Sequence, residues 1–140
     1  MSTILRPFGR TGLMVSPVTL GTMEFGSKID EAEAGKLFAQ ALDAGVNVFD
    51  TANVYASGRS EEILGRLIGS MRERLILGTK FAVPTDSLDP NSGGASRRTV
   101  IAACEASLRR LGTTTSTCTS SIDRSPRPRS MKRCGLSTTS

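Results

Sequence analysis

The first 113 residues alternate between short β-rich segments and amphipathic helical segments, and this alternation restricts the fold more than any other feature. A Gly-containing hairpin signal comes first, at residues 4–14. Three pairs of a β-rich and a helical segment follow, at residues 15–22 and 30–45, 46–50 and 60–68, and 75–80 and 97–111. Such alternation is typical of parallel strands joined by crossover helices. The chain is therefore predicted to be an α/β protein, built as either an open doubly wound sheet or a (β/α)8 barrel.

Local signals indicate where the predicted helices begin and end. Asp30, with Glu33 three residues later, forms a capping-box pattern, and Gly45 suits the end of that helix. Ser60 is predicted to cap the second helix, and Gly112 to end the third. We expect Glu61 and Glu62, and also Arg72, Glu73 and Arg74, to lie on solvated faces. The third helix is predicted to pack through one apolar stripe, with Cys104 as a core thiol: Val100, Ile101, Cys104, Leu108 and Leu111.

Composition excludes several classes of function. No apolar run approaches the ~20 residues of a membrane span, and residues 1–10 lack a signal-peptide stretch, so we expect a cytoplasmic protein without membrane partners. The three cysteines show no CxxC spacing and there is no histidine, so no metal site is expected. The missing histidine also excludes His-based triads and His general bases within this sequence.

Three reactive side chains follow the predicted strands. Asp50 ends the second strand, Tyr55 lies in the loop after it, and Lys80 ends the third strand. Because the carboxyl ends of parallel strands share one face, we expect these side chains to converge there. An ammonium beside a phenol favours phenolate, and a carboxylate can hold that ammonium in place. A phenol in this setting can protonate a carbonyl oxygen, but the hydride for a reduction must come from a cofactor.

The motifs that contain these residues resemble the N-terminal part of an aldo-keto reductase. The matching pattern is RPFGRTGLMVSPVTLGTMEFG, GVNVFDTANVYASGRSEEILGRLIG, LGTKF and SRRTVIAACEASLRRLGT, which covers about residues 5–113. The resemblance implies the first three βα units of a (β/α)8 TIM barrel after an N-terminal hairpin. It also implies an oxidoreductase that reduces small aldehydes or ketones with NADPH. Tyr55 would be the general acid, Lys80 would tune it, and Asp50 would hold Lys80.

The resemblance also suggests a cofactor site and its incompleteness. Gly21 and Thr22, together with Asp50, match positions near the nicotinamide. The fourth catalytic group of the family is a His, which this sequence lacks. Most contacts to the cofactor phosphates come from later βα loops of the family. We therefore expect the chain to be inactive by itself, and the sequence does not identify its substrate.

Residues 114–140 differ from the body in composition. They contain 13 Ser or Thr, five basic residues and one acidic residue, and residues 114–122 show neither a strand nor a helix pattern. We expect an irregular, disordered tail after a domain that ends near Thr113. Read in the neighbouring frame with suitable third bases, residues 114–122 can encode Asp-Tyr-Ile-Asp-Leu-Tyr-Gln-Leu-His, which resembles the fourth strand of the family. Our hypothesis is a one-base frameshift near codon 113, which leaves a truncated barrel.

Two alternatives concern partners. The tail segment SIDRSPRPRS resembles Arg-Ser-rich segments that bind RNA, although it has no aromatic residue for base stacking, so nucleic acid is not the expected partner. A truncated barrel would leave sheet edges and apolar faces uncovered, so we expect marginal stability and a tendency to self-associate. The chain could then be a non-catalytic interaction fragment rather than an enzyme.

Overall fold

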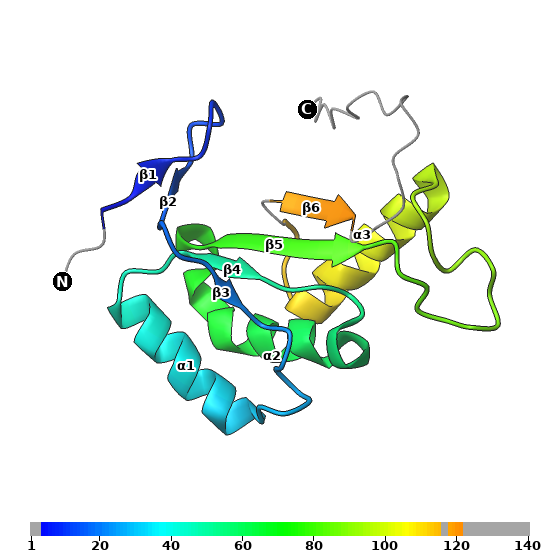
Figure 1. Cartoon of the computed structure of the whole chain (residues 1–140), viewed down its shortest axis with the longest axis horizontal. Helices are drawn as coiled ribbons and strands as arrows, with labels where there is room; N and C mark the ends of the chain where they lie inside the picture. The colour runs from blue at the N-terminus through cyan, green and yellow to red at the C-terminus, as the bar shows by residue number, and fades with distance from the viewer. Residues whose placement is uncertain (1–3, 116–117, 122–140) are drawn as a thin grey trace.

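The computed structural model describes residues 4–115 and 118–121 and contains a four-stranded parallel sheet (Figure 1). The strands lie in the order in which they occur along the chain: β3 (Leu20–Gly21), β4 (Val48–Asp50), β5 (Ile76–Phe81) and β6 (Cys118–Ser121). One α-helix follows each of the first three strands: α1 (Glu31–Asp43), α2 (Arg59–Ile68) and α3 (Arg97–Leu111). The alternation predicted from the sequence is confirmed.

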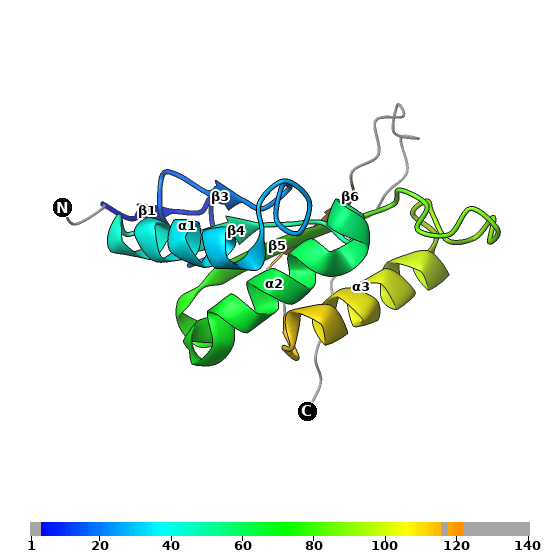
Figure 2. The same cartoon turned by 90° about the horizontal axis from the view of Figure 1, so that it is seen from below.

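The helices all lie on one face of the sheet. Figure 1 shows α1, α2 and α3 on the same side of the strands, and Figure 2 shows them side by side from that side. A doubly wound sheet carries helices on both faces and reverses its strand order, whereas a (β/α)8 barrel keeps sequential order with the helices outside. The observed order and layering are those of a barrel wall that is open rather than closed.

The predicted N-terminal hairpin is present at the amino ends of the parallel strands. β1 (Arg6–Pro7) pairs antiparallel with β2 (Met14–Val15), and Gly9 and Gly12 in the connection have φ values of 58° and 79°. Asn47, just before β4, attaches the hairpin to the sheet. Its Nδ2 donates to the Met14 carbonyl at 2.9 Å, and its Oδ1 accepts from the Ser16 amide at 2.8 Å.

Most of the predicted helix ends are confirmed. The Asp30 Oδ1 accepts from the Glu33 amide at 2.9 Å, and Gly45 follows α1 with a φ of 80°. Gly112 ends α3 with a φ of 63°. The prediction for α2 is wrong: the helix begins at Arg59 after Gly58, and Ser60 lies inside its first turn, fully buried. Serine is a residue type that often caps helices, but the Ser60 hydroxyl contacts Thr22 and Thr51, just after β3 and β4, instead of a helix amide.

The core lies between the sheet and the helices. Phe49 of β4 and Leu77 of β5 face the helices with 0% and 1% of their surface exposed, and the Phe49 ring lies 4.8 Å from that of Phe38 in α1. Alternate residues of β5 are buried and half-buried, as expected for a strand with one covered face. The remaining buried apolar members of this cluster come from α2, the residue after η2 (Gly69–Arg74) and α3: Leu64, Ile68, Leu75 and Leu111.

The packing face of α3 differs from the prediction. Only Leu111 of the predicted stripe is buried, Cys104 is half-buried, and Ile101 is 46% exposed. The helix instead packs its small polar side toward the rest of the domain, with Thr99 and Ser107 buried. Thr99 contacts the preceding loop, where its Oγ1 donates to the Asn91 carbonyl at 3.3 Å, and the end of α3 lies close to α2, since a Cβ built on Gly65 would lie 2.6 Å from the Leu111 carbonyl oxygen. Gly65 permits that approach at the end of α3, where the Leu111 side chain joins the core.

The prediction of an irregular segment after Thr113 is wrong for Cys118–Ser121. These residues form β6, paired in parallel with β5 in the register Gly78–Cys118 to Phe81–Ser121. The free edge of β5 offers backbone donors and acceptors whatever the side-chain pattern of the partner, which explains why the pattern did not reveal this strand. Residues 122–140 lie outside the described residues, so the predicted disorder there remains a prediction.

Arg72 supports the approach to β6, which also corrects its prediction as a solvated side chain. Its guanidinium donates to the Thr115 carbonyl at 2.7 Å and 3.1 Å, and to the Leu75 carbonyl at 2.9 Å. Partial burial lowers the pKa of this guanidinium from its usual value. Arg72 thus joins η2 to the segment that precedes β6.

None of the helices within the described residues combines the length and the apolar character that crossing a membrane requires.

Candidate active site

The three predicted reactive residues lie together at the carboxyl end of the sheet. Asp50 is the last residue of β4, and Lys80 is the next-to-last residue of β5. Both alternate with core residues, so their side chains lie on the face opposite α1, α2 and α3, which no helix of the described residues covers. Tyr55 begins η1 (Tyr55–Gly58), the turn between β4 and α2. The sequence-based expectation that these residues converge agrees with this geometry.

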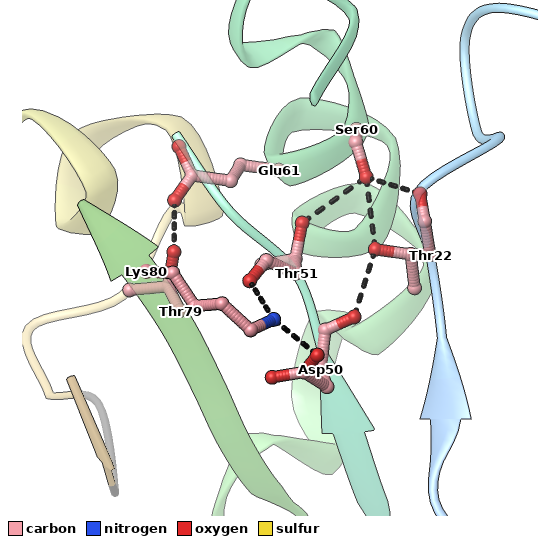
Figure 3. Close-up of polar contacts among 7 residues, drawn as sticks. All are labelled: Thr22, Asp50, Thr51, Ser60, Glu61, Thr79 and Lys80. Atoms are coloured by element: carbon pink, nitrogen blue, oxygen red, sulfur yellow. Dashed lines mark hydrogen bonds and ion pairs between the residues drawn. The ribbon is translucent and has the colours of Figure 1, made fainter. Parts of the chain in front are cut away.

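The ammonium of Lys80 is held by two acceptors from β4 and its extension (Figure 3). Its Nζ forms an ion pair with Asp50 Oδ2 and donates a hydrogen bond to the Thr51 carbonyl at 3.0 Å. The side chains of Lys80 and Asp50 are 21% and 39% exposed, so the pair is accessible from the open face. Both acceptors come from β4 and the residue after it, so the ammonium is fixed at the carboxyl end of that strand.

Tyr55 is brought to Lys80 by a tight turn. The Lys80 Nζ lies 5.4 Å from the centroid of the Tyr55 ring. The next two residues, Ala56 and Ser57, have φ values of 48° and 55°, and Gly58 follows at 93°. Consecutive residues in the left-handed region are costly for side chains other than glycine. The turn therefore needs support from its surroundings.

The predicted cofactor residues occupy two different environments. Gly21 lies beside Asp50 in the register of β3 with β4, and a Cβ built on it would meet no atom within 4 Å. Within the part of the chain that the structure describes, no atom therefore fills the space beside Asp50 that a side chain at position 21 would take. Thr22 is fully buried, and its Oγ1 donates to the Asp50 carbonyl at 3.2 Å and is 2.8 Å from Ser60 Oγ. Its side chain is already engaged within the protein.

Gly78 borders Asp50 on the opposite side from Gly21. The register pairs Asp50 with Gly21 of β3 and with Gly78 of β5, so a glycine flanks the carboxylate on each side. A Cβ built on Gly78 would lie 3.3 Å from Asp50 Oδ1, tighter than ordinary contact. The two glycines thus leave room for the carboxylate to turn toward Lys80.

Ser60 is a supporting residue that sequence reasoning assigned to the wrong role. Its Oγ donates to the Thr22 carbonyl at 2.7 Å and lies 3.1 Å from Thr51 Oγ1, in addition to its contact with Thr22 Oγ1 (Figure 3). All three side chains are fully buried. This cluster joins the carboxyl ends of β3 and β4 to the start of α2, and Thr22 Oγ1 connects it to the Asp50 carbonyl.

Glu61 was predicted to be solvated, and this is wrong. Its side chain is 0% exposed, its Oε1 accepts from Thr79 Oγ1 at 2.6 Å, and its Oε2 accepts from Arg110 Nε at 2.6 Å. No signal in the sequence distinguishes Glu61 from the exposed Glu62 beside it, since both suit the first turn of a helix. Only the long-range contacts with β5 and α3 separate them.

The arrangement offers an acid–base function. A phenol, an ammonium and a carboxylate meet on an accessible face, where a neutral phenol can donate a proton and the ammonium can stabilise the phenolate that remains. Within residues 4–115 and 118–121, no cluster of three metal-ligating side chains is present. Among these three side chains, proton transfer is the chemistry that the residue types support.

Comparison with known proteins gives consistent results. The family model described as "Aldo/keto reductase family" matches residues 17–117. The chain is 42% identical over 117 residues to "Uncharacterized oxidoreductase YrpG" of Bacillus subtilis, covering 75% of this chain and 35% of that protein. It is 41% identical over 107 residues to "Probable voltage-gated potassium channel subunit beta" of Oryza sativa subsp. japonica, covering 74% and 32%. The chain thus spans about a third of the length of these curated relatives.

A solved structure agrees with the fold. The aldo-keto reductase AKR11C1 from Bacillus halodurans, in its holo form, matches with a TM-score of 0.74 and 29% identity, covering 85% of this chain and 40% of that one. The sheet described above is therefore a partial set of the βα units of a (β/α)8 barrel, as the sequence resemblance implied. With the family model matching most of its length, the chain belongs to the aldo/keto reductase family.

Proposed function

We propose that the chain carries the proton-transfer residues of an NADPH-dependent reductase of small aldehydes and ketones. The observation that supports this proposal is the position of Lys80, whose ammonium is bonded to Asp50 and lies 5.4 Å from the Tyr55 ring centroid. Tyr55 is the general acid that donates its phenolic proton to the carbonyl oxygen. Lys80 stabilises the phenolate left behind, and Asp50 keeps the ammonium oriented.

The open face beside Asp50 fits a nicotinamide ring. Gly21 presents no side chain there, and a Cβ at that position would meet nothing within 4 Å, so a planar group can approach the sheet. In this proposal Gly21 and the Asp50 side chain would hold the nicotinamide, and Thr22 would contribute only its backbone because its hydroxyl is engaged with Ser60. When bound, the cofactor supplies the hydride that no side chain can supply.

The 140-residue chain is proposed to lack turnover by itself and to act in the cytoplasm. It contains no histidine, whereas the family resemblance calls for one as a fourth catalytic group. We expect purified chain to show neither NADPH-dependent carbonyl reduction nor tight NADPH binding. Enhancement of NADPH fluorescence on mixing with the chain, saturable with protein concentration, would contradict this part of the proposal.

A chimera that supplies the missing part of the barrel tests the catalytic roles of Tyr55, Lys80 and Asp50. Residues 1–113 would be joined to the remaining strands and helices of the Bacillus halodurans reductase, and reduction of an aldehyde panel would be followed by NADPH absorbance. Replacement Tyr55→Phe should lower the rate by about 100-fold or more, the usual contribution of a general acid. Arg66→Met, which changes an exposed residue of α2, is the matched control and should retain activity. A Tyr55→Phe chimera as active as its parent would refute the assignment.

The frameshift remains our proposal for the origin of residues 114–140. Sequencing the gene around codon 113 tests it, because the neighbouring frame should then encode the strands and helices of a continuing barrel. An interaction role is a second candidate, favoured by the sheet face that no described helix covers. Co-purification with a full-length reductase from the source cells would support that role.

A further inference from the structure

An ion pair with a fully buried carboxylate, which the proposed reaction does not use, lies beside the active-site residues. Glu61 of α2 is 0% exposed, and its partner Arg110, from the last turn of α3, is 27% exposed at the side chain. Burying a carboxylate is costly unless it is paired and hydrogen-bonded. Each Glu61 oxygen accepts a hydrogen bond, one from Thr79 and one from Arg110, so the buried carboxylate is both paired and hydrogen-bonded.

Each end of this ion pair reaches a segment that carries a proposed catalytic residue. Thr79, which donates to Glu61 Oε1 at 2.6 Å, is the residue before Lys80 in β5. Arg110 crosses Gly58, the last residue of the turn that begins with Tyr55. A Cβ built on Gly58 would lie 2.7 Å from Arg110 Cδ and 2.9 Å from its Nε, so the arginine stem rests on that backbone.

The Tyr55 turn requires such support. Ala56, Ser57 and Gly58 all have left-handed backbone conformations, and strained segments of this kind persist only where their surroundings hold them. The backbone hydrogen bonds from Tyr55 N to the Ala52 carbonyl and from Ser57 N to the Val54 carbonyl are both 3.2 Å, at the upper end of the ordinary range. The Arg110 stem packs over the end of the turn and is itself fixed by Glu61.

We propose that Glu61 and Arg110 are positioning residues that set the placement of Tyr55 relative to Lys80. The pair joins β5 next to Lys80 to the turn that carries Tyr55, through α2 and α3. This inference rests on the proposed function in one respect, because the placement of Tyr55 relative to Lys80 matters for proton transfer. The mechanical coupling between the ion pair and the Tyr55 turn stands on the contacts alone.

Tyr55 provides a direct probe of this coupling. It is the only tyrosine, and the chain contains no tryptophan, so ultraviolet-excited emission near the tyrosine maximum reports on this one side chain. The test measures acrylamide quenching of that emission in the 140-residue chain and in the variants Glu61→Gln, Arg110→Met and Arg110→Lys. Glu61→Gln keeps an acceptor for Thr79 but removes the charge, and Arg110→Lys keeps the charge and most of the stem over Gly58.

We expect Glu61→Gln and Arg110→Met to raise the quenching constant by about twofold or more, because a released turn opens locally. Arg110→Lys should restore most of the parent value. The matched control is Arg66→Met, which breaks the exposed ion pair between α2 and Glu31 of α1 and should leave Tyr55 quenching unchanged. Far-UV circular dichroism confirms that each variant is folded.

Unchanged quenching in folded Glu61→Gln and Arg110→Met variants would overturn the proposal. An equal rise in Arg66→Met would also overturn it, because the effect would then be general loosening of α2. If Glu61→Gln does not fold, Thr79→Val removes only the hydroxyl donated to Glu61 and must raise the constant in the same way. The quenching test measures no reductase activity. Unchanged quenching would therefore refute the positioning role of Glu61 and Arg110, whereas an active Tyr55→Phe chimera would refute the proposed function.

Discussion

The two faces of the parallel sheet are built from alternate residues of the same strands, yet they do different work. On the helix-covered face, Phe49, Leu77 and Thr79 are almost completely buried. On the open face, Asp50 and Lys80 are partly exposed and bonded to each other. Because successive strand residues point to opposite faces, the covered face can supply stability while the open face retains polar chemistry. In β5, for example, Thr79 lies on the covered face and the next residue, Lys80, lies on the open face.

The largest expected effect contrasts two such neighbours. Leu77→Ala removes a core side chain that is 1% exposed and should lower the free energy of unfolding by about 2–5 kcal/mol. Ile76→Ala, on the open face and only half-buried, should cost about 1 kcal/mol. Urea unfolding followed by circular dichroism measures both. Equal losses would mean that the open face is covered in solution, for example by a second molecule.

Removal of the Ser60 hydroxyl is the next effect in size. Ser60→Ala leaves the buried hydroxyls of Thr22 and Thr51 without their shared partner and should cost about 1–3 kcal/mol in the free energy of unfolding. The same urea measurement applies. Ser70→Ala, at an exposed position in η2, is the matched control and should change little. A cost as small as that of the control would show that the cluster does not hold the strand ends together.

Replacement of Lys80 should lower the free energy of unfolding by less than Leu77→Ala or Ser60→Ala does. Lys80→Met breaks the ion pair with Asp50, but both side chains are partly exposed, so the free energy of unfolding should change by only about 0–1 kcal/mol. In the chimera, the same variant should lose most of its reductase activity. A large loss of stability would argue that Lys80 belongs to the structural framework rather than to the chemistry.

The smallest effect is a pH dependence on the outer surface of the helices. Arg66 donates to both Glu31 oxygens at 2.7 Å and 2.8 Å, and this lowers the pKa of Glu31 from its ordinary value of 4.5. A lowered carboxyl pKa gives stability that is present above the ordinary value and lost as the pH falls through the lowered one. Arg66→Met should therefore be slightly less stable than the parent at pH 7. The difference in stability between Arg66→Met and the parent should vanish in acid, where Glu31 is protonated. A difference that grows as the pH falls would contradict this prediction.

What the sequence predicts well is local. The cap at Asp30, the stop at Gly112 and the end of β4 at Asp50 follow from turn chemistry and residue periodicity, and the structure shows each of them. The grouping of Asp50, Tyr55 and Lys80 also followed, because the topology of parallel strands places their carboxyl ends together.

What the sequence did not predict depends on contacts between distant segments. Glu61 and Glu62 look equivalent in a first turn, and only Thr79 and Arg110 make one of them buried. Ser60 resembles a cap until Thr22 and Thr51 are placed beside it. β6 forms on the edge of β5 through backbone pairing, which leaves no periodicity to detect.

The central claim is that Tyr55 and Lys80 meet on the open face of the sheet. Nuclear Overhauser measurement on chain with a labelled tyrosine ring tests it directly, because only one tyrosine is present. With the Lys80 Nζ 5.4 Å from the ring centroid, we predict cross-peaks between the ring protons of Tyr55 and the terminal methylene protons of Lys80. A folded chain in which the ring shows contacts to other residues but none to Lys80 would contradict the account.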